Sequence, residues 1–481
     1  MSFQPVLLWS DLCIWLLVLG CGLGAWASSR LPPLRAAWSR VGRSRPGMAA
    51  ATLLVFFALA GLLDSLHYRP LLPPVAGEKA ADAADAVNKA AYSVEVLSVL
   101  DAVLTPLRTQ VEKTYSAPLA TRAYARETIE QRQPDGSLRT LRDYPRLKYG
   151  GAALGGDEAG VAGDVLLRCL RALLLAAVAW LVVAAVVTRR VAQAGAAGWR
   201  AAWRSIWRGD TGFAWSAVLG TLAAVLLVAA LIAGPAAAYH VFGTDKVGQD
   251  VLYQVLKSVR TALVIGLVTT LVTLPLGVFL GIVAGYFRGW VDDLIQYLYT
   301  TLSSIPGVLL IAAAVLMMQV VIDTHPQWFV TAAERADLRL LALCFILGLT
   351  SWTGLARLLR GEALKLRELE YVQAAQAFGV SDLRIIGRHL LPNLMHIVII
   401  ALVMDFSGLV LAEAVLSYVG IGVDPTMISF GTMINNARME LGREPAVWWS
   451  LVAAFAFMFS LVLAANLLAD AVRDAFDPRM V

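Results

Sequence analysis

Charged side chains are scarce in this sequence, at 16% of 481 residues, whereas hydrophobic side chains make up 58%. Soluble domains carry about a quarter charged residues, so this shortage argues against an ordinary soluble protein. The apolar runs are long and lack the two-residue alternation of barrel strands, which predicts an all-α polytopic membrane protein. The net charge of +5 is no sign of nucleic-acid binding, because the arginines cluster in short links between apolar runs.

Several chemical motifs are also missing. There is no G-x-x-x-x-G-K-[ST] sequence with which to hold a nucleotide, no H-E-x-x-H, no Ser/His/Asp set and no convincing carboxylate dyad. We therefore expect no enzymatic activity, no catalytic residue and no cofactor bound by this chain. The few cysteines show neither metal-ligand spacing nor a disulfide framework, so no metal site is expected; they are Cys13, Cys21, Cys169 and Cys344. The N-terminus lacks the marks of a cleaved signal peptide, so the first apolar run is expected to remain as a span.

Hydropathy and length predict nine membrane spans. They lie near 6–26, 48–65, 167–188, 213–234, 261–286, 295–321, 337–357, 396–419 and 447–470. The links at 30–45 and 189–208 are rich in arginine, which places both in the cytoplasm by the positive-inside rule. The N-terminus is then outside and the C-terminus inside.

Four regions follow from this division. Residues 1–65 hold two spans and an Arg-rich cytoplasmic link, and residues 66–164 form an insert outside the cytoplasm. Residues 165–212 add a third span and a Trp/Arg segment, and residues 213–481 form a six-span core.

The insert is predicted to be helical. From Ala80 to Gln131 it carries apolar residues at helical spacing, namely Val87, Ala91, Val94 and Leu97. The sequence "QPDG" from Gln133 is a turn signal. A small helical domain is the simpler interpretation, and a substrate-sensing or partner-docking role is the alternative.

The segment "GWRAAWRSIWRGD" repeats tryptophan every fourth residue, with arginine one step later. One helical face is therefore indole and its neighbour is guanidinium. This pattern is typical of a helix lying in the lipid headgroup region, which makes membrane lipid an expected partner. An aromatic anchor that extends the next span is the alternative.

A second polar segment, at about 361–393, lies between the predicted spans 337–357 and 396–419. We expect one helix from Glu368 to Phe378, ended by Gly379, and a second helix capped by Ser381. Pro392 marks the start of the next span. Ala374, Ala375 and Phe378 would present a shallow apolar surface suited to a groove on another protein. A plain cytoplasmic connector is the alternative.

This segment resembles the E-A-A-x3-G-x9-I-x-L-P pattern of the membrane permeases of binding-protein-dependent ABC importers. The corresponding positions here are Gln373, Ala374, Ala375, Gly379, His389, Leu391 and Pro392. All match the consensus except Gln373, which replaces Glu, and His389, which replaces Ile. The resemblance implies that Gln373, Ala374, Ala375, Phe378, Gly379, Ser381, Leu391 and Pro392 couple the chain to ATPase subunits.

Further motifs resemble the dipeptide/oligopeptide branch, and the C-type member of its permease pair. One is "FGTDKVGQDVL", matching at Gly243, Thr244, Asp245, Gly248 and Asp250. Another is "LAEAVLSYVGIGVDP", matching at Glu413, Ser417, Gly420, Gly422 and Pro425. The resemblance places both on the outer face, where Glu413 would be hydrated and serve a gate or docking role. "GYFRGWVDD" and the C-terminal "DAVRDAFDPRM" also match, so the likeness spans residues 213–481.

The resemblance implies a type I permease fold and a set of partners. These are a homologous second permease subunit, two cytoplasmic ABC ATPases that hold ATP and Mg, and an extracytoplasmic binding protein that delivers peptide-like cargo. The implied location is the bacterial inner (cytoplasmic) membrane, with many passes.

Polar residues within the spans leave alternatives open. Asp405 is a possible pathway residue, or else a paired structural aspartate or one near the membrane interface. Ser303 and Ser304 lie beside Pro306, where a bend would serve a pathway or only packing. Asp405 and Asp64 would instead serve an ion-gradient-driven secondary transporter, which needs no ATPase. A membrane-anchored sensor or scaffold built on residues 66–164 is the remaining alternative.

Overall fold

The computed structural model describes residues 3–30, 32–71, 92–132, 138–155, 158–195, 198–329 and 331–476. Within these ranges nine helical segments are long and apolar enough to cross a membrane, which confirms the prediction of an all-α polytopic membrane protein. The spanning helices are α1 (Trp9–Arg30), α3 (Arg45–Asp64), α7 (Val161–Ala194), α9 (Trp215–Ala236), α10 (Val251–Phe287), α12 (Gly307–Thr324), α13 (Ala332–Arg367), α16 (Leu391–Val419) and α18 (Trp449–Phe476).

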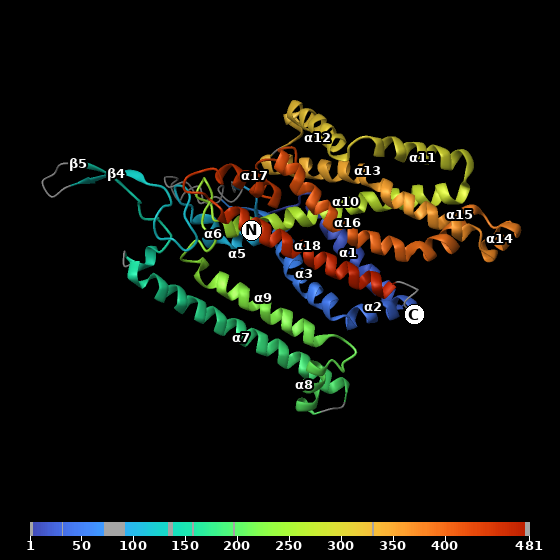
Figure 1. The fold of residues 1–481 in the computed structure, drawn as a ribbon, viewed down its shortest axis with the longest axis horizontal. Coiled ribbons are helices and arrows are strands. Elements are labelled where there is room, and N and C mark those ends of the chain that lie inside the picture. Colours follow the sequence, from blue (N-terminus) through green and yellow to red (C-terminus); the bar gives the residue numbers. More distant parts are fainter. Residues whose placement is uncertain are drawn as a thin grey trace, which may run out of the picture.

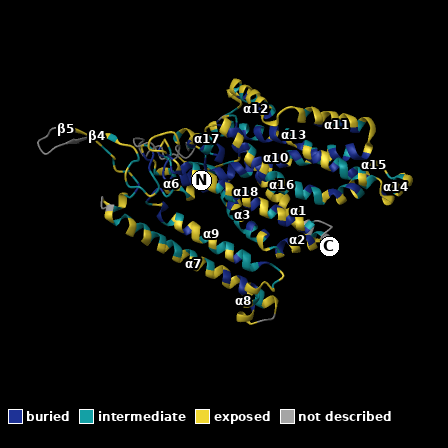
Figure 2. Cartoon of the chain, viewed as in Figure 1, coloured by how far each residue is buried: buried dark blue, intermediate teal, exposed yellow. Residues whose placement is uncertain are grey.

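Helices α10 and α13 form the centre of the bundle (Figure 2). Small residues let their backbones approach closely, as is usual between membrane helices. A Cβ added at Gly281 would lie 2.7 Å from the carbonyl oxygen of Ala356, and one added at Gly285 would lie 2.7 Å from that of Arg360. Helices α16 and α18 pack on this pair, and their apolar side chains complete the core.

Helix α9 departs from the expected six-span core. It packs mainly on α7 and α3, so α7 and α9 form a hairpin beside the bundle (Figure 1). Trp180 Nε1 of α7 donates to the carbonyl of Leu219 of α9 at 2.9 Å, which joins the two helices. The first two spans differ from this pair, because α1 and α3 contact α10 directly.

The predicted span at 295–321 is wrong. Helix α11 (Gly289–Ser304) ends before α12 begins, and Ile305 between them is extended. Proline has no N–H to continue the α11 ladder, so Pro306 starts a new helix. Pro275, by contrast, remains inside α10.

The predicted helical insert is also wrong over its described part. It contains strands β2 (His67–Pro70), β3 (Leu97–Ser98), β4 (Glu127–Arg132) and β5 (Leu138–Asp143), with short helices α5 (Val99–Val103) and α6 (Thr105–Thr109). Strand β1 (Phe3–Val6) pairs antiparallel with β2, and β2 pairs with β3. Long-range strand pairing therefore decides the conformation of Leu97, which local spacing cannot reveal. Val87, Ala91 and the "QPDG" sequence lie outside the described residues.

The remaining elements connect the spans. They are α2 (Pro32–Arg43), α8 (Trp199–Arg208), α14 (Glu370–Ala377), α15 (Asp382–Ile385), a π-helical turn (Ile386–Leu390), α17 (Phe430–Glu440) and the 3₁₀ turns Ala152–Leu154, Glu158–Gly160 and Pro326–Trp328. Figure 1 shows the β4–β5 hairpin at one end of the molecule and α14 at the opposite end, with α2 and α8 in the half of the molecule that holds α14. The Arg-rich links and the 361–393 segment thus lie on the side away from the hairpin, in agreement with the charge pattern.

Candidate functional site

The 361–393 segment folds as a helix, a glycine turn and a second helical stretch. Gly379 has φ +73°, and the Val380 N–H donates to the carbonyl of Ala375 at 3.1 Å. The Gly379 N–H donates to the carbonyl of Gln376 at 2.9 Å, so α14 ends in a Schellman motif. The predicted glycine stop is confirmed. We call residues 369–390, with α14 and α15, the knuckle.

Ser381 caps α15 only through its backbone. Its carbonyl accepts from the N–H groups of Arg384 and Ile385, but its side chain makes no capping hydrogen bond. The second helix is also less separate than expected, because α15, the π-helical turn and α16 run on as one segment from Asp382 to Val419. Pro392 lies at the start of α16, directly after the π-helical turn, and as a proline it has no N–H to donate within this continuous segment.

The base of the knuckle is fixed to the bundle. Val372, Ile385 and Leu390 are fully buried in an apolar cluster with residues of α10, α13 and α16. Tyr286, at the end of α10, donates its hydroxyl to Asp382 Oδ1 at 2.7 Å and accepts from Gln376 Nε2 at 3.2 Å. Movement of the knuckle is therefore tied to three membrane helices.

The tip of the knuckle is apolar and exposed. Phe378 is 87% exposed and Leu383 is 80% exposed, although both side chains are large and apolar. Gln373 and Ala374 are also exposed, while Ala375 and Leu391 are partly buried. The structure therefore brings the predicted coupling residues from Gln373 to Ser381 to one projection, whereas Leu391 and Pro392 follow it at the start of α16. Sequence analysis did not single out Leu383, because its exposure depends on how α15 packs against the rest of the protein.

The G-T-D motif lies against the insert. Glu112 N–H donates to the carbonyl of Gly248 at 2.9 Å, and Thr244 Oγ1 accepts from the Ser116 N–H at 2.7 Å. Gly248 has φ +78°, and a Cβ added there would lie 1.9 Å from the carbonyl oxygen of Glu112. Residues 112–116 of the insert thus cover the motif, and its two glycines leave room for them; the other is Gly243, with φ +70°.

The two aspartates of this motif shape the loop and start α10. Asp245 Oδ1 accepts from the N–H groups of Val247 and Gln249, both at 2.9 Å. Asp250 caps α10 by accepting from the Leu252 N–H at 2.8 Å. Both carboxylates are thereby occupied within the chain.

A buried histidine joins the insert to this cap. His240 Nδ1 lies 2.8 Å from Asp250 Oδ2, and His240 Nε2 lies 3.5 Å from Glu112 Oε1. Burial opposes the charge on His240, but the two carboxylates outweigh it and raise the pKa of His240 to about 9. Burial also opposes the charge on Glu112, yet His240 and the N–H groups of Tyr149, Lys148 and Gly150 lower the pKa of Glu112 to about 2.

The second motif of the resemblance, from Glu413 to Pro425, is packed rather than hydrated. Glu413 is 2% exposed and accepts hydrogen bonds from the hydroxyls of Ser417, at 2.6 Å, and Ser429, at 2.9 Å. The expectation of a hydrated Glu413 is therefore wrong, because the loop after α16 folds back over it. Gly420, at φ +87°, makes that reversal, and a Cβ at Gly422 would lie 1.9 Å from Ser417 Oγ. Pro425 is exposed on the same loop.

The possible pathway residues do not gather in one place. Asp405 lies partly buried on α16, and in the described part of the chain no hydrogen bond or ion pair engages it, which disfavours the paired structural interpretation. Ser303 and Ser304 are exposed at the break before α12. Helix α12 packs on α13, whereas α16 packs mainly on α10 and α18.

Sequence analysis did not predict a buried network of charged side chains that the structure contains. Arg260 of α10 donates to Asp11 Oδ1 of α1, and Lys257 of α10 lies 2.6 Å from Asp64 Oδ1 of α3. Lys257 also lies 3.0 Å from Asp101 Oδ2 in the insert. Both cations lie just before the predicted span at 261–286, and only the fold shows that aspartates of four other segments reach them, with Asp337 of α13 lying 3.9 Å from Arg260. Over the described residues, no group of three or more His, Cys, Asp or Glu side chains could hold a metal ion.

Comparison with known proteins identifies the family of this chain. Residues 277–481 match the family described as binding-protein-dependent transport system inner membrane component. The oligopeptide transport system permease protein OppC of Mycobacterium tuberculosis is 30% identical over 51% of this chain and 77% of that protein. The dipeptide transport system permease protein DppC of Bacillus subtilis is 30% identical over 51% of this chain and 71% of that protein.

Two further similarities complete the comparison. The glutathione transport system permease protein GsiD of Pectobacterium atrosepticum is 30% identical over 51% of this chain and 75% of that protein. A solved structure of the MetNI methionine ABC transporter, in an inward-facing conformation, covers 47% of this chain and 97% of its own at 17% identity. Its TM-score of 0.34 is too low to support a conclusion about the fold. On the family match and the curated relatives, the chain belongs to the binding-protein-dependent transport system inner membrane components, which are the membrane permeases of ABC importers.

Proposed function

We propose that this permease imports peptides or peptide-like cargo delivered by an extracytoplasmic binding protein. The names of the curated relatives, which refer to oligopeptide, dipeptide and glutathione transport, support this cargo class. The chain does no chemistry of its own. Energy comes from two cytoplasmic ABC ATPases that bind ATP and Mg, and a second homologous permease subunit completes the pathway in the bacterial inner membrane.

The knuckle transmits the work of the ATPases to the bundle. The observation that carries this proposal is the contrast between its exposed tip, Phe378 and Leu383, and its fully buried base, Val372, Ile385 and Leu390. An exposed apolar tip on a fixed base suits insertion into a groove on another protein. Closure of the ATPase pair then shifts α10, α13 and α16 together, as a rigid-body transition between outward and inward access.

Reconstitution of the complex in proteoliposomes tests the proposal. ATP hydrolysis that rises with the binding protein, together with ATP-dependent uptake of a peptide, is the expected result. Both should be lost in a complex whose permease carries Phe378→Asp and Leu383→Asp, because charged side chains do not enter an apolar groove. Phe279→Asn on α10 removes an exposed aromatic side chain outside the knuckle and should leave assembly with the ATPases intact.

The alternatives predict different results in the same experiment. Peptide uptake driven by an ion gradient in liposomes without ATPases would favour a secondary transporter. Unchanged uptake after removal of residues 1–212 would count against the insert as the functional part.

A further inference from the structure

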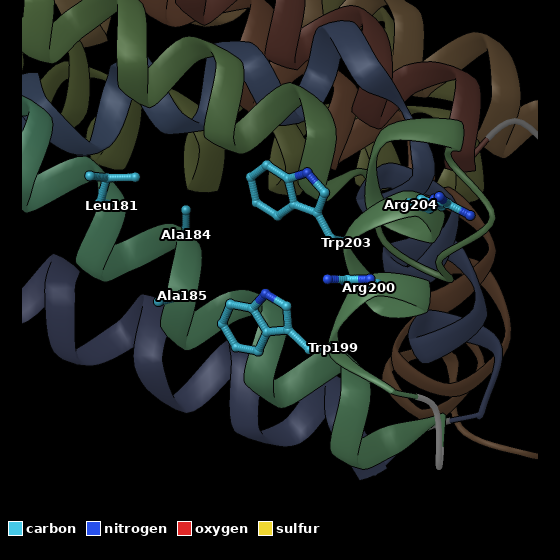
Figure 3. A pocket seen from close by; sticks show the side chains of 7 residues that line it. All are labelled: Leu181, Ala184, Ala185, Trp199, Arg200, Trp203 and Arg204. Carbon is cyan, nitrogen blue, oxygen red and sulfur yellow. The ribbon is translucent and has the colours of Figure 1, made fainter.

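A groove lies between the cytoplasmic end of α7 and the short helix α8. Its volume is about 580 Å³, and Figure 3 shows its lining, which consists of Leu181, Ala184, Ala185, Trp199, Arg200, Trp203 and Arg204. The floor is apolar and comes from α7, while the indoles and guanidinium groups come from α8. The groove thus has an apolar side and a cationic side.

Helix α8 is held firmly enough to form such a wall. Ala202 and Ile206 are buried against α7 and α9, with Ile206 fully buried. Gly209, at φ +84°, ends α8, so α8 does not extend the next span. The interpretation as an anchor that lengthens α9 is therefore wrong.

The cationic side has no counter-ion within the described chain. Arg200 and Arg204 make no ion pair or hydrogen bond among the residues the structure describes. The whole link from 189 to 212 contains five arginines and one acid, Asp210. An anion supplied from outside the chain would satisfy these guanidinium groups, and bidentate geometry makes arginine a strong ligand for phosphate.

The apolar side continues into a surface suited to acyl chains. Leu181 is 59% exposed and Leu174, two turns further along α7, is 66% exposed. Trp199 is 52% exposed at the mouth of the groove, where an indole can lie at headgroup level. A free phosphate ion would leave this apolar surface unused, whereas a phospholipid covers both sides.

We propose that this groove is a binding site for one anionic phospholipid. Arg200 and Arg204 hold the headgroup phosphate, Trp199 and Trp203 flank the glycerol region, and an acyl chain lies along Leu181 and Ala185. This site lies away from the knuckle and does not depend on the cargo or the ATPases. It makes the α7–α9 hairpin a lipid-anchored support for the bundle.

Photolabelling of the full chain in nanodiscs tests the site. The probe is phosphatidylglycerol with a diazirine in the acyl chain, and phosphatidylcholine with the same diazirine is the neutral comparison. Labelled peptides are mapped by mass spectrometry. We expect the anionic probe to label residues 174–185 strongly and the neutral probe to label them weakly.

Variants separate a built site from general attraction to the membrane. Arg200→Gln with Arg204→Gln should lower the affinity for phosphatidylglycerol about thirtyfold, since each arginine near a membrane surface contributes roughly fivefold. Arg40→Gln with Arg43→Gln removes the same charge from α2 and should change labelling of α7 less than about twofold. Ala185→Trp fills the groove without changing charge and should also abolish labelling.

Three results would overturn the site. They are equal labelling by the two probes, equal loss in the α2 control, and unchanged labelling in Ala185→Trp. Suppression of labelling by excess inorganic phosphate would show a site for the free anion instead of a lipid. A matching elution profile and melting temperature for every variant exclude misfolding as the cause.

Discussion

Arg260 Nη2 of α10 lies 2.6 Å from Asp11 Oδ1 of α1, and both side chains are buried. His67 Nδ1 contacts the other carboxylate oxygen of Asp11 at 2.7 Å, and Ser10 accepts from Arg260 at 2.7 Å. The first span is thus joined to the central helix by a paired and hydrogen-bonded charge. With Lys257 and Asp64, this contact makes the N-terminal spans part of the bundle rather than an appendage.

Removal of this arginine should destabilise the whole protein. Arg260→Met keeps the length of the side chain but leaves Asp11 and Asp337 facing each other without it. A buried charge that loses its partner costs roughly 3 kcal/mol or more. The measurement is thermal or denaturant unfolding in nanodiscs. Lys113→Met breaks an exposed pair with Glu127 and should cost less than about 1 kcal/mol. Equal effects of the two substitutions would refute the structural role of Arg260.

Because of the buried His240, the free energy of unfolding should fall as the pH rises into the alkaline range. Its folded-state pKa of about 9 lies above the usual value of 6.5, so its contribution is complete below pH 6.5 and disappears as pH rises through about 9. From these values, stability should fall by about 2 kcal/mol between pH 7 and pH 9. His240→Gln should flatten the curve over that range. Parallel curves for the two proteins would show that His240 does not titrate in this way.

Glu112 should make the free energy of unfolding fall at acidic pH. Its folded-state pKa of about 2 lies below the usual 4.5, so its contribution is present above pH 4.5 and is lost as pH falls towards about 2. Glu112→Gln should therefore narrow the stability difference between pH 6 and pH 3. An unchanged acid limb in this variant would contradict the role of Glu112.

Gly248 should control how the insert docks on the N-terminal end of α10. In Gly248→Ala the new Cβ would meet the backbone of Glu112, which cannot move aside as a side chain could. We expect faster hydrogen exchange and proteolysis of residues 92–132. Gly155→Ala has a similar positive φ of +57° but open space around it, so it isolates backbone strain from the clash. Similar exchange in the two variants would mean that contact with Glu112 is unimportant.

Gly379 should be required for coupling rather than for assembly. Gly379→Val has space for its side chain, but a β-branched residue resists the φ of +73° that the turn needs. We expect ATP hydrolysis to continue while peptide uptake falls at least about tenfold, corresponding to roughly 1.4 kcal/mol of lost coupling. Gly387→Val lies in the same segment, also in open space and without a positive φ, and should retain most uptake. Fully coupled uptake by Gly379→Val would exclude a special role for this glycine.

The sequence alone predicted those features of the fold that local sequence patterns determine. Long apolar runs set the number of spans, and Gly379 marked the turn because only its backbone freedom fits a Schellman motif there. Sequence analysis did not predict features that depend on contacts between segments far apart in the chain. The strand at Leu97 forms because β2 lies beside it, and the burial of Glu413 follows from the return of the loop after α16. The cations Lys257 and Arg260 had no visible partners until the fold brought four aspartates to them.

The central proposal is that the knuckle is the contact through which ATPase subunits drive this permease. The most direct measurement places a photo-crosslinking amino acid at position 378, in place of the exposed Phe378, in the assembled complex. The same amino acid at position 279 on α10 provides the control. The account predicts a crosslink to an ATPase subunit from position 378, changed in yield by ATP, and none from position 279. Absence of any ATPase crosslink from position 378 in an active complex would contradict it.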